Sequence, residues 1–210
     1  MPPMMPVLSR CVVLFCLAVA GVGGEDRRAS DSQNTSALTW RACQRCHSTR
    51  EMQRGPLLEG LPAIYLKSQL LKFKTGVRGR NPQNRSEYLM GSMRDMIPES
   101  VALDRLVNYI STRQPRPHIA TLRGDTRRGK AVYQGCRHCH TPNSDIPVLT
   151  QLEPWYVLDQ LRKYKQGLRG GHADDRNGKL MQRILAPLSD SDLKSVAIYI
   201  QHQKRTPAAP

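Results

Sequence analysis

The sequence predicts an all-α protein built from two tandem domains, each with about three helices around one site. Three observations lead to this prediction: a tandem repeat, apolar residues at helical spacing in each copy, and a cysteine–histidine pattern that occurs once per copy. No segment shows the alternation of apolar and polar residues that is typical of β-strands. A chain of 210 residues is long enough for two small domains.

The repeat is visible when the chain is aligned with itself. Segment 65–79, YLKSQLLKFKTGVRG, matches segment 156–170, YVLDQLRKYKQGLRG, at an offset of 91 residues. Two copies of a CxxCH pattern, at 43–47 and 136–140, match at an offset of 93. The small change in offset indicates short insertions within a tandem domain duplication, and the long period excludes a solenoid of short repeats.

Composition suggests where the domains begin and end. Residues 1–24 hold an early arginine, an apolar run too short to span a bilayer comfortably and an Ala-Val-Ala sequence, which together predict a signal peptide cleaved between residues 20 and 24. A retained membrane anchor is the alternative. We predict a first domain over 25–111, a proline-containing linker over 112–122 and a second domain over 123–210.

Helices are expected at three places in the second copy. The first covers 125–136, with Asp125 as its N-cap. The second covers 155–165, where apolar residues recur at helical spacing before a glycine. The third covers 188–201 and begins at Ser189 or the aspartate after it.

The first copy has counterparts of these helices. A helix over 65–74 is expected to end at Gly76, and another is expected over 98–111. The leading helix is expected to be shortened to the segment NTSALTWRAC, residues 34–43. The sequence IPES stands where the second copy has the capping sequence LSD.

Four cysteines remain once the predicted signal peptide is removed, and all four lie in the two CxxCH patterns. The pattern places two thiols about one helical turn apart, which suits thioether bonds to the two vinyl groups of one haem. The adjacent histidine then serves as the proximal iron ligand. We predict two covalently attached c-type haems, bound through Cys43, Cys46, Cys136 and Cys139, with His47 and His140 as ligands of the two irons.

Other uses of paired cysteines agree less well with the sequence. A thioredoxin-like redox pair needs a βαβ context, which the helical pattern does not provide. A zinc site or two tight disulfides would use the cysteines but would leave both histidines and the duplication without a role. The aromatic content of 5% is low for two protein-only cores, and a large apolar cofactor would help to fill them.

The sixth ligand of each iron should recur in both copies. Met90 and Met181 match at an offset of 91 and are therefore predicted to bind the first and the second iron, respectively. Met93 stands opposite Ile184 and is the main competitor of Met90, because a local insertion lies nearby. Methionine is more often core filler than a ligand, so the repeat is what makes the selection.

The remaining histidines lack matching partners in the other copy. They are His118, His138, His172 and His202. His138 lies inside the second CxxCH pattern and is expected to point away from the iron. Bis-histidine ligation is therefore disfavoured in both copies.

A proline follows each motif histidine at a similar distance. Pro56 comes 9 residues after His47, and Pro147 comes 7 residues after His140. We considered two interpretations: a plain loop proline, or a loop whose backbone carbonyl accepts the hydrogen of the histidine ring and so fixes its tautomer.

These residues resemble a known family. The order CxxCH, Pro-Leu loop, YLxxQLxxFKxGxRG helix, methionine and final LSDxDL helix is similar to that of class I cytochromes c, and the tandem form is similar to dihaem cytochromes c of the c4 type. The resemblance covers about residues 34–202 and is closest in the second copy. It implies two class I cytochrome c domains, a periplasmic electron carrier that serves a terminal oxidase or another acceptor, and two haems whose propionate edges meet between the domains.

The function expected from this ligand set is single-electron transfer, because methionine–histidine ligation leaves no open position at iron. The alternatives are a cytochrome subunit of a dehydrogenase that oxidises sulfur compounds or alcohols, and a dihaem peroxidase.

A net charge of +15 predicts redox partners with acidic docking surfaces. It also allows peripheral membrane association, whereas no nucleic acid is expected as a partner, and the protein is expected as a monomer or in a small complex. Lysines such as Lys72, Lys74, Lys163 and Lys165 are candidates for docking, although a solvated helix face is the commoner role for any one of them.

Overall fold

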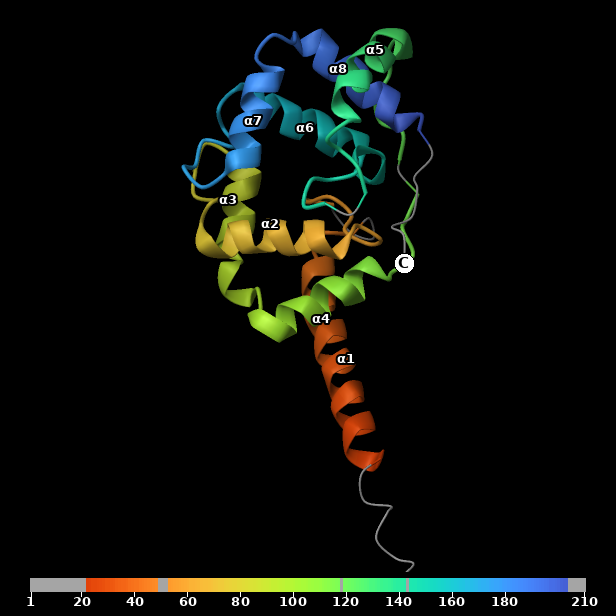
Figure 1. Cartoon of the computed structure of the whole chain (residues 1–210), viewed down its shortest axis with the longest axis vertical. Coiled ribbons are helices and arrows are strands. Elements are labelled where there is room, and N and C mark those ends of the chain that lie inside the picture. Colours follow the sequence, from red (N-terminus) through yellow and green to blue (C-terminus); the bar gives the residue numbers. More distant parts are fainter. Residues whose placement is uncertain (1–21, 49–52, 118, 143, 204–210) are drawn as a thin grey trace, which may run out of the picture.

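The computed structural model describes residues 22–48, 53–117, 119–142 and 144–203, and every regular element in these ranges is a helix (Figure 1). The all-α prediction is therefore confirmed. The predicted signal peptide lies almost wholly among residues 1–21, outside the described ranges. Within the described ranges, no helix combines the length and the apolar character that crossing a membrane requires.

The two halves repeat the same order of helices, and each half fills one end of the molecule in Figure 1. The first half contains α1 (Val22–Gln44), α2 (Ala63–Thr75), α3 (Arg85–Ser92), the 3-10 helix η1 (Arg94–Met96) and α4 (Ser100–Ser111). The second half contains α5 (Thr126–Cys136), the 3-10 helix η2 (Leu149–Gln151), α6 (Pro154–Lys165), α7 (Arg176–Leu185) and α8 (Asp190–Gln201).

Each half has one α-helix more than the sequence predicted. The additional helices are α3 and α7, which contain the candidate ligands Met90 and Met181, respectively. Both begin after a buried polar residue, Asn84 or Asp175. In α7 the Asp175 carboxylate accepts the N–H of Gly178 at 3.0 Å, which satisfies one of the free donors of the first turn.

The leading helix of the first half is not shortened, so that expectation was wrong. Helix α1 has 23 residues and extends away from the rest of the chain (Figure 1). Its C-terminal part carries apolar residues that reach the core, among them the buried Trp40. The upstream residues are polar and contain no proline, so they continue the helix without showing an apolar stripe in the sequence.

Helix ends in the second half follow the predicted capping residues. The Asp125 carboxylate accepts the N–H of Arg127 at 2.8 Å at the start of α5. Ser189 and Asp192 form a reciprocal capping box at the start of α8. In the first half, α4 follows Glu99 without a side-chain cap, as the replacement of LSD by IPES implies.

The first and last helices of each half cross at close range. Helix α5 packs against α8, and α1 packs against α4. A side chain at Gly129 of α5 would meet the backbone oxygen of Ser195 of α8 at 2.0 Å, so glycine is needed at this crossing. This packing fixes the direction in which α1 and α5 deliver the CxxCH motifs that begin at their C-terminal ends.

Polar contacts join the two halves. The buried Glu153 carboxylate of the second half accepts the backbone N–H of Leu57 of the first half at 2.7 Å. Lys72 and Lys163 occupy equivalent positions in the repeat, and each reaches the start of a helix in the opposite half. Lys72 Nζ lies 2.9 Å from Asp175 Oδ1, and Lys163 Nζ lies 2.7 Å from Ser86 Oγ.

Candidate functional site

Each half contains a largely apolar cavity lined by its own CxxCH motif. The first cavity, of about 210 Å³, is lined by Cys43, Cys46, His47 and Met90 together with surrounding apolar residues. The second cavity, of about 370 Å³, is lined in the same way by Cys136, Cys139, His140 and Met181. The structure therefore brings together, in each half, all the residues that the sequence analysis selected.

The two cavities are adjacent. Five residues line both of them: Tyr65, Gln69, Leu152, Tyr156 and Gln160. The two tyrosines and the two glutamines are equivalent pairs in the repeat, contributed by α2 and α6. A group in one cavity is thus separated from a group in the other by a single layer of side chains.

Both motif histidines are held by a proline carbonyl. The Nδ1 atom of His47 lies 2.7 Å from the carbonyl oxygen of Pro56, and Nδ1 of His140 lies 2.7 Å from that of Pro147. Because a carbonyl only accepts, Nδ1 must carry the hydrogen, which leaves Nε2 unprotonated and available as a ligand. The interpretation of the two prolines as part of a carbonyl contact to histidine is confirmed.

Burial keeps the two histidines in the form that binds metals. It lowers the pKa of both His47 and His140, and the contact with the proline carbonyl opposes this shift only in part. The rings are therefore neutral at neutral pH. In the first half the ring of His47 is also packed against Gly55, where an added Cβ would lie 2.6 Å from Cε1.

The four motif cysteines are free thiols rather than disulfides. Cys43 and Cys136 pack against the apolar core, and burial raises the pKa of both thiols. Backbone hydrogen bonds from His47 N to Cys43 O and from His140 N to Cys136 O, at 3.0 and 3.1 Å, give both motifs the same helical turn. This turn sets both thiols and the histidine of a motif on one cavity wall.

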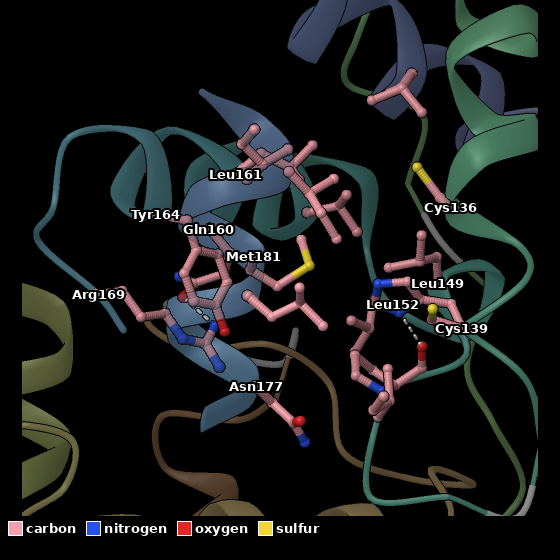
Figure 2. A pocket seen from close by; sticks show the side chains of 18 of the residues that line it. Cys136, Cys139, Leu149, Leu152, Gln160, Leu161, Tyr164, Arg169, Asn177 and Met181 are labelled. Carbon is pink, nitrogen blue, oxygen red and sulfur yellow. Dashed lines mark hydrogen bonds between the residues drawn. The ribbon is translucent and has the colours of Figure 1, made fainter. Parts of the chain in front are cut away.

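Met181 stands across the second cavity from the motif cysteines. Figure 2 shows its sulfur directed from α7 into the space that Cys136 and Cys139 border from the other side. Met181 and Met90 both pack against the apolar core. Met93 and Met96 also line the first cavity, but 42% and 57% of their surfaces are exposed to solvent.

Other histidines are not part of the two cavity walls. His138 and His202 are exposed at the surface, and His172 Nδ1 accepts the backbone N–H of Asp174. His118 lies outside the described residues. The expectation that His138 points away from the second site is confirmed.

A buried polar cluster lies where the two cavities meet, and the sequence analysis did not identify it. It contains Arg78, Glu87 and Arg169, with Gln69 and Gln160 from the shared wall. Arg78 lines the first cavity and Arg169 the second. The signal was available in the repeat, because both arginines belong to the matching GxRG segments and a buried arginine requires a partner.

The four lysines named as docking candidates are engaged within the molecule. Lys72 and Lys163 bridge the two halves as described above, and Lys74 Nζ lies 2.6 Å from the carbonyl oxygen of Ile97. Lys165 Nζ donates to the carbonyl oxygen of Ala186 at 2.9 Å. Lys72, Lys74 and Lys163 are half-buried in these contacts, whereas Lys165 is exposed. The periodicity of a helix shows which residues share a face but not what covers that face.

The cytochrome c family model matches residues 126–204, the second half of the chain. A cytochrome c4 of Azotobacter vinelandii is 26% identical over 208 residues, which cover 90% of this chain and 95% of the relative. A thiosulfate dehydrogenase electron acceptor of Thiomonas intermedia is 26% identical over 214 residues, covering 91% and 92%. The chain is thus similar to cytochrome c4 proteins over about nine-tenths of its length. The cytochrome c4 structure of Acidithiobacillus ferrooxidans has the same fold, with a TM-score of 0.60 and 20% identity over 77% of this chain and 98% of that one.

This similarity supports the prediction of two covalent c-type haems in a carrier of electrons. The cavities fit this cofactor on chemical grounds. Their walls are apolar, each offers two free thiols and a histidine with a free Nε2, and the arginines at their junction suit the carboxylates of a haem. The Nε atom of Arg169 is buried and makes no hydrogen bond among the described residues, and the Glu87 carboxylate lies 3.5 Å from it.

Proposed function

We propose that the chain is a periplasmic carrier of single electrons that delivers them toward a terminal oxidase, with one redox centre in each cavity. Cys43, Cys46 and His47 attach and ligate the first haem, with Met90 as the second axial ligand. Cys136, Cys139 and His140 do the same for the second haem, with Met181. The observation that carries this proposal is the matched geometry of the two cavities, each with a carbonyl-held histidine and a core-packed methionine.

The residues of each cavity account for electron transfer without bond chemistry. Haem c supplies a one-electron iron centre, and a methionine ligand raises its reduction potential. The carbonyls of Pro56 and Pro147 hold the histidines in one tautomer and orientation, so that little rearrangement accompanies a change of charge. The apolar walls exclude water, and the single layer of side chains between the cavities provides a short route from one centre to the other.

The ligand assignment can be tested in the purified haem-loaded protein. We expect two haems per chain and the charge-transfer band of methionine-ligated ferric haem. Met90→Ala and Met181→Ala should each remove about half of this band, whereas Met96→Ala, at an exposed methionine of the same wall, should leave it unchanged. A band of undiminished intensity in both Met90→Ala and Met181→Ala would contradict the assignment. A band halved by substitution of Met93 but not of Met90 would move the first ligand to Met93.

A second candidate function is that of electron acceptor for a dehydrogenase that oxidises sulfur compounds. The thiosulfate dehydrogenase electron acceptor of Thiomonas intermedia is as similar to this chain as the cytochrome c4 is, at 26% identity with comparable coverage. Reduction of the oxidised protein by thiosulfate in the presence of a thiosulfate dehydrogenase would favour this function. Reduction by a quinol-oxidising complex and reoxidation by a terminal oxidase, with no response to the dehydrogenase, would favour the first.

The periplasmic location is part of the proposal. It is supported by the signal-peptide pattern of residues 1–24 and by the covalent haem motifs. Fractionation of the native host, followed by N-terminal sequencing of the mature protein, tests it. A new N-terminus between residues 20 and 25 in the periplasmic fraction is the expected result, and an intact N-terminus in the membrane fraction would contradict it.

A further inference from the structure

The two cavities are built from a repeated sequence, but the buried Glu87 at their junction has no counterpart in the second half. At the offset of 91 residues, Arg78 matches Arg169 and Gln69 matches Gln160. The same offset places Glu87 opposite a glycine, Gly178. The first half therefore holds a carboxylate at this point, and the second half does not.

Glu87 lies at the junction of the two cavities and lines only the first of them. Its side chain is 7% exposed. Its Oε1 atom lies 2.7 Å from Nη2 of Arg78 and 3.5 Å from Nε of Arg169. One carboxylate is thus shared by two arginines that are equivalent in the repeat.

The arginines make two symmetrical contacts besides this, one of which is stacking over an aromatic ring: Arg78 over Phe73 and Arg169 over Tyr164. Each donates to the glutamine nine residues before it: Arg78 to Gln69 Oε1 at 2.6 Å, and Arg169 to Gln160 Oε1 at 2.5 Å. Arg169 also reaches across to Gln69 Oε1 at 3.2 Å. The cluster therefore carries two buried positive charges and one negative charge, and the negative charge stands on the wall of the first cavity.

Backbone packing explains why only the first half can carry this carboxylate. In the second half, a side chain at Gly178 would meet Gly170 Cα at 2.5 Å, because α7 touches the preceding loop in its first turn. In the first half the corresponding contact is made by Gly91, four residues after Glu87, where a side chain would meet Gly79 O at 2.2 Å. The glycine that makes this contact stands one helical turn later in α3 than in α7, so position 87 has room for a side chain.

Glu87 is also close in sequence to the proposed iron ligand of its half. It precedes Met90 by three residues on α3, so both lie on the same side of the helix. The second half has its own buried carboxylate, Asp175, but that residue is not part of either cavity wall and is paired with Lys72. A buried negative charge next to one redox centre favours its oxidised form, since oxidation adds positive charge.

We infer that Glu87 is a positioning and tuning residue that lowers the reduction potential of the first redox centre relative to the second. The inference rests on the proposed function, because it requires a haem in each cavity. It assigns a direction to the pair: electrons leave the first centre more readily and are held more strongly by the second. The cause is a single residue that the duplication does not repeat.

The test is a spectroelectrochemical titration of the haem-loaded protein that resolves two midpoint potentials. Met90→His, which replaces only the ligand of the first iron, identifies the midpoint that belongs to that centre. In Glu87→Gln we expect the first midpoint to rise more than the second. Glu87→Asp, which keeps the charge, should restore most of the original value, and Glu99→Gln, which removes a charge from the exposed surface of the same half, should change neither midpoint appreciably.

Equal shifts of both midpoints, or no shift, in Glu87→Gln would overturn the inference. If Glu87→Gln does not retain both haems, a second neutral variant, Glu87→Ser, can replace it, because it leaves room for water beside the arginines. This variant should shift the first midpoint in the same direction. The haem count and the methionine–iron band of the unaltered protein distinguish a failure of the proposed function from a failure of the inference about Glu87. Their absence contradicts the proposed function, whereas their presence with unaltered potentials in the Glu87 variants contradicts only the inference.

Discussion

Lys72 of the first half lies 2.9 Å from Asp175 of the second half, the residue that caps the helix carrying Met181. Asp175 is 2% exposed, and its Oδ1 atom also accepts the N–H of Gly178. Burial raises the pKa of Asp175, but Lys72, the N–H of Gly178 and the charge of Arg169 together outweigh this effect and lower the pKa. A side chain of one half therefore helps to hold the helix that presents the proposed iron ligand of the other half.

Removing this lysine should destabilise the joined halves. Lys72→Met keeps the length of the side chain but leaves the Asp175 carboxylate without its cation, so we expect the free energy of unfolding to fall by about 1–3 kcal/mol. Urea unfolding of the haem-loaded protein at neutral pH measures this change. Lys67→Met is the matched control, because the Lys67–Asp104 pair is exposed on both sides and should contribute less than about 1 kcal/mol. Equal losses in the two variants would contradict the role given to the Lys72–Asp175 contact.

Gly55 should be required for ligation of the first haem. An added Cβ would lie 2.6 Å from the ring of His47, and that ring cannot move without breaking its contact with the Pro56 carbonyl. We expect Gly55→Ala to reduce the methionine–iron band of the first haem and to leave the second unaffected, as measured by optical spectra of the oxidised protein. Gly171→Ala, where the nearest atom would be 3.9 Å away, serves as the control. An unchanged spectrum in Gly55→Ala would show that the His47 ring has more freedom than the structure indicates.

The capping box of α8 should stabilise the second half. Ser189 accepts the N–H of Asp192 at 3.1 Å, and the Asp192 carboxylate accepts the N–H of Ser189 at 2.9 Å. Ser189→Ala should lower the free energy of unfolding by about 0.5–2 kcal/mol, because the N–H of Asp192 loses its acceptor and the Asp192 carboxylate loses the Ser189 hydroxyl. Ser191→Ala, at an exposed position in the first turn of the same helix, should be neutral or slightly stabilising, because alanine favours helices. Thermal unfolding compares the two variants, and a larger loss from Ser191→Ala would argue against the cap.

The buried Glu87 should make stability depend on acid pH. Burial alone raises the pKa of Glu87, but the charges of Arg78 and Arg169 outweigh it and lower the pKa from 4.5 to about 2. A carboxyl whose pKa is lowered by folding stabilises the folded state above its unfolded pKa, and this contribution is lost as the pH falls from about 4.5 toward 2. Its size is on the order of 3 kcal/mol.

Unfolding of the wild type and of Glu87→Gln at pH 7 and at pH 3 measures this contribution. The difference in free energy of unfolding between the two proteins should be large at pH 7 and smaller at pH 3. Glu99→Gln, at an exposed glutamate, should show little difference at either pH. A difference of the same size at both pH values would mean that the ionised carboxylate is not what stabilises the cluster.

Much of the site could be predicted from the sequence because each motif occurs in both copies of the repeat. The two CxxCH patterns located the cysteines and histidines, and the offset of 91 residues selected Met90 and Met181, which both pack against the core beside a cavity. Capping residues such as Asp125 and Ser189 acted locally, so their effect could be anticipated from a few neighbouring residues. The length of α1 could not, because a polar helix shows no apolar periodicity.

The sequence by itself determined the local chemistry of this protein: the motifs, the ligand candidates, the helices and the duplication. Only the tertiary structure decided what lies between the two copies, because contacts such as those of Glu87 and Lys72 join residues that are far apart in the chain. A repeat predicts equivalent positions, but it does not predict which surfaces of the two copies face each other. The charges that appeared available for partners in the sequence are therefore partly used to join the halves, and Glu87, which has no counterpart in the repeat, lies beside the first site.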